Sequence, residues 1–308
     1  DRVLVVGGGP AGLEAALTAA RRGFEVVVAE EAADFGGRLR FESALPGLRA
    51  WNRVIEYRLG RLRQMANVSL YAGSRMTADD VLAFGARRVV LATGATWEPF
   101  LCGANELPTA PIEAPRTYTP GDLAAGALPE GPVAVFDYDN NYMGSAVAEL
   151  LALRGLAVTY VTSAGAADAW GVMTNEQPWV HQSFAKLGIV QRTLEIVTAF
   201  DGETLSLAQI MSGEARAIPA RSLVIVGLRR GRAALHDALK AADLAGAGIA
   251  SLHLTGDANA PGAIAHAIYQ AHATARGLGH APGTLPVLRD APFAARDFAG
   301  TPADGAAR

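Results

Sequence analysis

One stretch near the start of the chain decides its fold: Val3-Leu4-Val5-Val6-Gly7-Gly8-Gly9-Pro10-Ala11-Gly12. The continuous, valine-rich run at its start is typical of a buried parallel strand. Gly7, Gly9 and Gly12 have G-x-G-x-x-G spacing. In this motif the first glycine allows a tight turn, the second lets backbone approach a pyrophosphate, and the third lets the next helix pack on the strand. Glu30 closes the following apolar run, where its carboxylate can accept hydrogen bonds from both hydroxyls of a ribose. The pattern predicts a dinucleotide-binding unit.

Two later turns extend the candidate site. Ala92-Thr93-Gly94 ends a buried strand, and Gly256-Asp257 ends the last one. Both turns resemble motifs of the glutathione-reductase-like flavoproteins, which bind two dinucleotides. In that family the Asp hydrogen-bonds the ribityl–pyrophosphate part of FAD, and the next helix points its N-terminus at the flavin ring. A simple helix N-cap is the alternative role for Asp257. The candidate cofactor-binding residues are Gly7, Gly9, Pro10, Ala11, Gly12, Glu30, Glu31, Gly37, Arg38, Met76, Ala92, Thr93, Gly94, Gly256, Asp257, Ile264 and Ala265.

Strands alternate with helices along the chain, which predicts an α/β protein with doubly wound parallel sheets. We expect two Rossmann-like, glutathione-reductase-type domains, the second inserted in the first. The expected division is an FAD- or ADP-binding domain (1–98 plus 246–281), a connector (99–132), an inserted NAD(P)-like domain (133–245) and an irregular tail (282–308). Helices are expected near 10–22, 49–66, 143–154, 179–187 and 261–278. Strands are expected near 2–6, 26–29, 68–71, 89–95, 133–136, 158–161, 189–198, 205–210, 222–227 and 252–257.

The composition limits the possible partners and compartments. The 308 residues carry a formal net charge of −3, which argues against a nucleic acid or an anionic membrane as partner. No apolar run approaches the roughly 20 residues of a spanning helix. The single cysteine, Cys102, excludes an intrachain disulfide and a cysteine-ligated iron–sulfur cluster on this chain, and a cytoplasmic location is expected. The chain opens on a core strand without an initiating Met, so we expect that preceding residues were removed or belong to another chain.

A second turn occupies the equivalent place in the inserted unit, but its glycines are replaced. It reads Asp139-Asn140-Asn141-Tyr142-Met143-Gly144, and only the last glycine, the packing one, is kept. Asn141 has a side chain where backbone would touch a phosphate, and the charges of Asp137 and Asp139 would repel a pyrophosphate. The next strand ends at Thr162-Ser163, without an acid for a ribose or an Arg for a 2′-phosphate. NAD(P)H binding is therefore not expected.

Several short segments of the sequence resemble the C-terminal half of the trimethylamine dehydrogenase-like flavoproteins. They are Gly36-Gly37-Arg38, 42–48, Trp51, Arg53, 137–144, 148–151, Trp170 and 174–176. This branch includes dimethylamine, histamine and dimethylglycine-type dehydrogenases and lies beside 2,4-dienoyl-CoA reductase. The resemblance covers about residues 1–280.

The resemblance implies a partner for this chain. Members carry an N-terminal barrel with FMN and a cysteine-bound iron–sulfur cluster, so both are expected only on a partner module. The assembly would oxidatively demethylate or deaminate a small amine and pass electrons to an electron-transferring flavoprotein. In trimethylamine dehydrogenase itself the nucleotide site holds ADP, so FAD and ADP both stay open here.

Three functions remain open from the sequence. The first is the nucleotide-binding portion of an amine dehydrogenase or demethylase, the second an FAD-dependent NAD(P)H reductase, and the third a non-catalytic scaffold that holds ADP. No catalytic residue and no metal ligand is assigned. The basic cluster Arg229-Arg230-Gly231-Arg232 can belong to the nucleotide site, a partner surface or a solvated turn.

Overall fold

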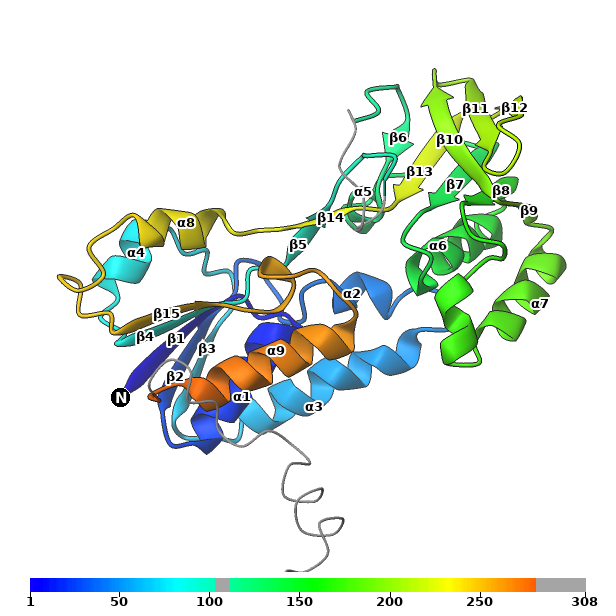
Figure 1. Cartoon of the computed structure of the whole chain (residues 1–308). Helices are drawn as coiled ribbons and strands as arrows, with labels where there is room; N and C mark the ends of the chain where they lie inside the picture. Colours follow the sequence, from blue (N-terminus) through cyan, green and yellow to red (C-terminus); the bar gives the residue numbers. More distant parts are fainter. Residues whose placement is uncertain (103–110, 281–308) are drawn as a thin grey trace, which may run out of the picture.

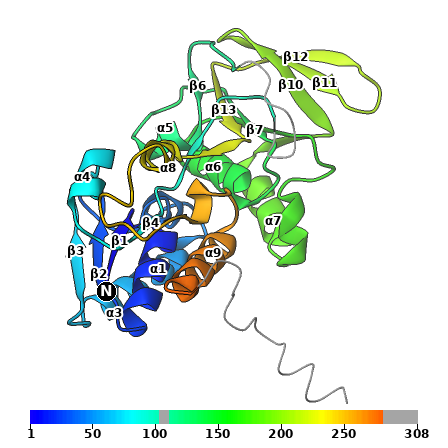
Figure 2. The same cartoon turned by 60° about the vertical axis from the view of Figure 1, so that its left-hand side comes forward.

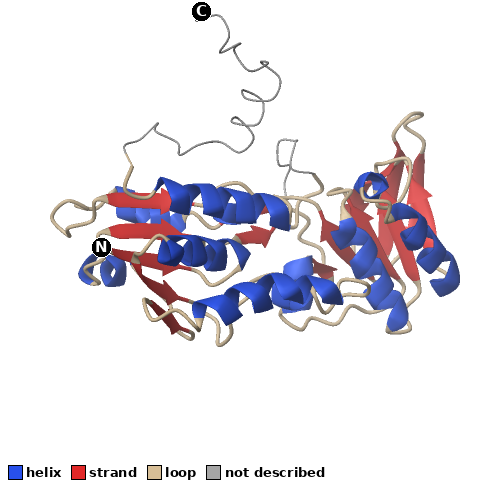
Figure 3. Cartoon of the chain, turned by 90° about the horizontal axis from the view of Figure 1, so that it is seen from below, coloured by secondary structure: helices blue, strands red, loops and turns tan. Residues whose placement is uncertain are grey.

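The computed structural model describes residues 1–102 and 111–280 and shows two lobes, each built on a five-stranded parallel sheet (Figure 1). The first lobe holds the first strands and the last helix of the described chain, and the second lobe holds the middle of the chain. Figure 3 shows the strands of the two lobes as separate groups with helices lying along them. Within the described ranges, every helix is too short or too polar to cross a bilayer. The expected tail 282–308 lies outside the described residues.

The sheet of the first lobe has the order β15-β4-β1-β2-β3. Its strands are β1 (Arg2–Val6), β2 (Glu25–Ala29), β3 (Val68–Tyr71), β4 (Arg88–Leu91) and β15 (Ser251–Leu254). All of its pairs are parallel, and Val3 of β1 faces Val26 of β2. Val3, Leu4 and Val5 are wholly buried, because helices cover both faces of the sheet.

The helices of the first lobe divide between these two faces. One face packs against α1 (Pro10–Arg21), α3 (Asn52–Leu62) and α9 (Ile264–Gly277). The other face packs against α4 (Ala78–Ala83) and α8 (Ala234–Lys240). Shorter pieces are α2 (Leu39–Glu42), η1 (Arg49–Trp51) and η3 (Gly256–Ala258). The predicted strand–turn–helix at the start of the chain is thus the centre of this lobe.

The sheet of the second lobe has the order β6-β13-β7-β8-β9. Its strands are β6 (Thr117–Tyr118), β7 (Val133–Asp137), β8 (Val158–Thr162), β9 (Val190–Thr193) and β13 (Ser222–Val226), and its helical pieces are α5 (Pro120–Ala124), α6 (Tyr142–Leu153), η2 (Ala169–Met173) and α7 (Gln177–Leu187). The helices α6 and α7 cover one face. The other face is covered by an antiparallel sheet of β10 (Glu195–Phe200), β11 (Thr204–Gln209) and β12 (Ala215–Pro219), which lies far from the first lobe in both views (Figures 1 and 2).

Two short strands, β5 (Ala95–Trp97) and β14 (Arg229–Gly231), pair antiparallel between the lobes. The α/β class with parallel sheets is confirmed, and several limits shift. The helix expected at 49–66 begins as the 3₁₀ turn η1 and ends at Leu62, and the one expected at 261–278 begins only at Ile264. The strand expected at 89–95 is interrupted after Leu91, so Ala95 begins β5 instead.

The expected domain limits stay a prediction. β6 falls in the expected connector but pairs with β13, so it belongs to the second sheet. α8 falls in the expected inserted domain, yet Leu239 on it is buried with the residues that cover the first sheet. Part of the connector, 103–110, lies outside the described residues.

Candidate functional site

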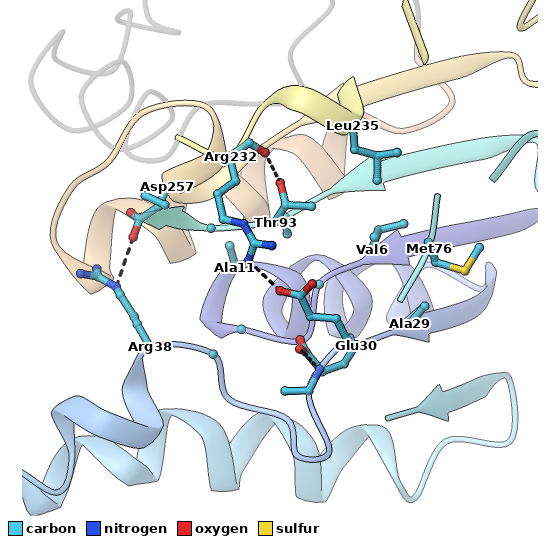
Figure 4. A pocket seen from close by; sticks show the side chains of 18 of the residues that line it. Val6, Ala11, Ala29, Glu30, Arg38, Met76, Thr93, Arg232, Leu235 and Asp257 are labelled. Carbon is cyan, nitrogen blue, oxygen red and sulfur yellow. Dashed lines mark hydrogen bonds and ion pairs between the residues drawn. The ribbon is translucent and has the colours of Figure 1, made fainter. Parts of the chain in front are cut away.

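A pocket of about 510 Å³ opens at the carboxyl ends of β1, β2 and β4 (Figure 4), where open α/β sheets bind ligands. Thirteen of the predicted residues line it: Gly7, Gly9, Pro10, Ala11, Glu30, Glu31, Gly37, Arg38, Met76, Ala92, Thr93, Gly94 and Asp257. Four predicted residues, Gly12, Gly256, Ile264 and Ala265, do not line it. The structure therefore brings together residues from five separate parts of the chain.

The three glycines of the turn are needed for different structural reasons. Gly7 has a φ of +106°, and a Cβ there would overlap the carbonyl of Ala92. A Cβ on Gly12 would overlap the carbonyl of Gly7, so Gly12 serves the packing of α1 on β1. At Gly9 the nearest atom to an added Cβ is the Cα of Gly37 at 3.7 Å, an ordinary contact. No described protein atom therefore demands glycine at Gly9, which fits a position kept bare for a ligand.

The first turn of α1 is suited to an anion. The helix begins at Pro10, and its N-cap, Gly9, has no side chain to accept a hydrogen bond. The backbone N–H groups at the start of a helix lack intrahelical acceptors, and the helix dipole favours negative charge there. A phosphate seated beside Gly9 would therefore be stabilised by the backbone alone.

Glu30 lies at the end of β2 with only 6% of its surface exposed. Its Oε2 accepts the Gly8 N–H at 2.5 Å, and its Oε1 accepts the Ala32 N–H at 2.8 Å. These bonds fix the carboxylate beside the glycine turn. Because a carboxylate offers about four acceptor positions, two remain for the hydroxyls of a ribose.

Other lining residues were not among the predicted cofactor-binding residues. They include Val6, Ala29, Ser74, Arg75, Arg232 and Leu235. Arg232 pairs with Glu31 at 2.7 Å. The Arg232 carbonyl accepts the Thr93 hydroxyl at 2.6 Å (Figure 4). The Arg232 guanidinium holds the pKa of Glu31 below its ordinary value. The sequence left several roles open for the basic cluster. In the structure, Arg232 of this cluster lines the pocket.

An ionic cluster closes the pocket at Asp257. Its Oδ2 lies 3.2 Å from Arg38 Nε and 3.6 Å from Arg229 Nη1, while its Oδ1 accepts the Gly262 N–H at 3.1 Å. Both arginines also donate to the Gly262 carbonyl. The N-cap of α9 is Ala263 and that of η3 is Thr255, so Asp257 caps neither helix.

The cluster continues between the lobes. Glu42 accepts the Tyr142 hydroxyl at 3.0 Å and lies 3.3 Å from Arg38. Burial raises the pKa of Glu42, although Arg38 and Tyr142 oppose the rise. Tyr142 belongs to α6, and its ring packs edge-on against Trp51 with 4.5 Å between ring centroids. The wall of the first pocket is therefore joined directly to the degenerate turn of the second lobe.

In that turn, side-chain oxygens accept the backbone N–H groups that a phosphate would use. Asn141 is the N-cap of α6, and its Oδ1 accepts the Tyr142 N–H at 2.9 Å. Asp137 is wholly buried and accepts the Asn140 N–H at 2.9 Å and the Tyr160 hydroxyl at 2.5 Å. Burial raises the pKa of Asp137 to about 8, so this group is mostly neutral at pH 7. The raised pKa weakens the expected repulsion by Asp137 at neutral pH. Burial also raises the pKa of Asp139, although Arg229 and Arg38 oppose the rise.

The described residues offer no group of three His, Cys, Asp or Glu side chains placed to hold a metal ion. The sheet order, the glycine turn and Glu30 together define a Rossmann-type nucleotide-binding protein. Residues 1–248 match the family model described as pyridine nucleotide-disulphide oxidoreductase. The chain belongs to this family and, within it, to the nucleotide-binding half of the trimethylamine dehydrogenase-like flavoproteins.

Three known proteins illustrate the similarity. Dimethylamine dehydrogenase of Hyphomicrobium sp. (strain x) is 30% identical over 89% of this chain and 41% of its own length. Histamine dehydrogenase from Rhizobium sp. 4-9 has a TM-score of 0.88 and 38% identity, over 94% of this chain and 45% of its own length. NADH oxidase of Thermoanaerobacter brockii is 33% identical over 64% of this chain and 29% of its own length. The chain thus spans less than half of each relative.

Proposed function

We propose that the chain is the nucleotide-binding portion of an amine or N-methylamine dehydrogenase, and that its pocket holds FAD. The observation that carries this proposal is one pocket that combines the bare Gly9 turn, the fixed carboxylate of Glu30 and Asp257. The names of the dimethylamine and histamine dehydrogenases support the substrate class. FAD, when bound, supplies two-electron redox chemistry, and this chain's residues hold and orient it.

The residues fit the two ends of FAD unequally. Gly9, the first turn of α1 and Glu30 suit the ADP half, which FAD and ADP share. At the other end, Arg38 and Arg229 already bind Asp257 and the Gly262 carbonyl, so a ribityl chain would have to share Asp257 with them. This closure supports ADP as the second candidate ligand, in which case the chain would be a scaffold without redox activity.

The nicotinamide reductase is the third candidate, and the name of the NADH oxidase relative supports it. Against it stand Asp139 and the Asn141 side chain, which takes the Tyr142 N–H. Since the relatives are more than twice as long as their matched parts, we propose that an FMN and iron–sulfur barrel module and an electron-transferring flavoprotein complete the activity.

One experiment separates these candidates. The purified chain is denatured, and the released nucleotide is identified by chromatography and absorbance. FAD at close to one per chain supports the redox site, whereas colourless ADP supports the scaffold. A chain that releases neither nucleotide, and takes up neither on incubation, refutes the proposal. Bleaching of a bound flavin by NADH without a partner would favour the reductase.

A further inference from the structure

A row of basic and aromatic side chains runs from η1 along the outer side of helix α3. Arg49 of η1 and Arg53, Tyr57 and Arg61 of α3 follow one another at intervals of four residues, a spacing that makes successive side chains neighbours on a helix surface. All four are exposed, whereas Ile55 and Leu62 on the opposite side are buried. We call these four residues the arginine ridge.

The ridge is positively charged, although the chain as a whole is negative. Residues 49–64 contain five arginines and one glutamate, while the whole chain has a net charge of −3. Arg58 is paired with Glu14. Within the described residues, Arg49, Arg53 and Arg61 have no carboxylate within ion-pair distance, so their charge is open to a partner.

Tyr57 adds an aromatic anchor to the ridge. Its side chain is 51% exposed, its hydroxyl accepts Arg21 Nη2 at 3.2 Å, and its ring centroid lies 5.8 Å from the Arg61 guanidinium carbon. Tyrosine and arginine are the residue types enriched in the parts of interfaces that contribute most binding energy. A tyrosine held between two arginines is therefore preorganised for contact.

A polar recess opens at the N-terminal end of the ridge. It measures about 320 Å³ and is lined by Arg40, Ser43, Ala44, Arg49 and Asn52. Arg40 is paired with Asp34 at 3.0 Å and the Asn52 amide donates to Glu56 at 2.5 Å. Arg49 therefore offers the guanidinium that suits a further carboxylate, because arginine binds carboxylates with two parallel hydrogen bonds.

We propose that the arginine ridge and this recess bind the acidic surface of a protein partner, which presents carboxylates at helical spacing. The ridge is about 18 Å long, from the rise of 1.5 Å per helical residue, which matches one helix of a partner. A nucleic acid would extend beyond the ridge onto a chain that is negative overall and would be repelled there.

The test uses the chain and two fluorescent, alanine-based peptides of the same composition. One peptide carries Glu at every fourth position, and in the other the glutamates follow one another. We expect the first to bind more tightly by anisotropy, with affinity that falls as salt rises. Arg53→Glu/Arg61→Glu should weaken binding at least tenfold, Arg53→Lys/Arg61→Lys should weaken it less, and Arg154→Glu, an exposed site at the end of α6, should leave it unchanged.

Thermal unfolding of each variant checks that the fold is intact. Equal binding by the wild type and the folded Glu variant would overturn the proposal. Tighter binding of duplex DNA than of the spaced peptide would also overturn it, as would no binding of either peptide at low salt.

Discussion

The Oδ1 atom of Asn141 accepts the backbone N–H of Tyr142 at 2.9 Å, at the first turn of α6. An intact glycine turn would leave this N–H to a phosphate. Replacing Asp139 and Asn141 together with glycine removes both the charge and the competing acceptor. We expect the dissociation constant for NADH, measured by calorimetry, to fall at least tenfold, about 1.4 kcal/mol.

Asn175→Gly is the matched control, since Asn175 is exposed and already has a φ of +61°. It should leave the NADH affinity of the wild type unchanged. If the double glycine variant also has unchanged affinity, these side chains are not what keeps NADH out.

Glu30→Gln tests the first pocket. The glutamate accepts backbone N–H groups on both oxygens, whereas a glutamine amide would place its NH₂ against one of these donors. Leaving a buried donor unsatisfied costs about 1–3 kcal/mol. We expect lower nucleotide content per purified chain and a lower melting temperature, while Glu25→Gln, at an exposed pair with Arg2, should change neither. Full nucleotide content in the Glu30 variant would show that this carboxylate does not read the ribose.

The ion pair of Glu14 with Arg58 joins three helices, because His272 on α9 also lies 2.9 Å from Glu14. Breaking a buried pair by removing one partner costs about 3–5 kcal/mol, and partial exposure of both groups places Arg58→Met near the lower limit. Urea unfolding at pH 7 measures the loss. Arg63→Met, on an exposed part of the same region, is the control and should lose little.

The same cluster predicts a pH dependence. Burial raises the pKa of Glu14, but the hydrogen bond with His272 and the Arg58 charge outweigh it, so the net pKa lies below the ordinary 4.5. A depressed carboxyl pKa stabilises the fold above pH 4.5, and this contribution is lost as the pH falls through the folded-state pKa. Unfolding curves between pH 3 and 6 should show this loss in the wild type and a smaller one in Glu14→Gln. Parallel pH profiles for the two proteins would refute the assignment.

Asp137 should have the opposite pH dependence. Its pKa rises from 3.8 to about 8, chiefly through burial, so the folded chain keeps a proton that the unfolded chain has lost. The free energy of unfolding then falls as the pH rises from about 4 to about 8. Asp137→Asn keeps the hydrogen-bonding shape but has no proton to lose. Its stability relative to the wild type should therefore rise across this range, by about 1.4 kcal/mol per pH unit. Asp79→Asn, at an exposed position on α4, should show no such gain, and a constant difference between Asp137→Asn and the wild type would contradict the raised pKa.

The sequence predicted those features that depend on residues close together in the chain, and missed those that depend on distant ones. The valine-rich run and the glycine spacing depend on neighbouring residues, and β1 and α1 appear where they were expected. β12, with only Ile218 partly buried among exposed neighbours, has no apolar pattern to reveal it. Arg232 reaches Glu31 across 201 positions of sequence, a contact that exists only because β14 returns the chain to the first lobe. The raised pKa of Asp137 likewise depends on burial in the folded chain, where its side chain lies against Tyr160 and Gly144.

Trp97 of β5 and Arg229 of β14 are register partners, and the Arg229 guanidinium carbon lies 5.0 Å from the Trp97 ring centroid. The chain therefore leaves the first lobe through β5 and returns to it through β14, and these two strands lie side by side. Replacing everything between these two residues with a hairpin loop of about 2–5 residues would join the strands without moving either end. Such a chain would lack the second lobe and would keep the Arg229 ion pair with Asp257.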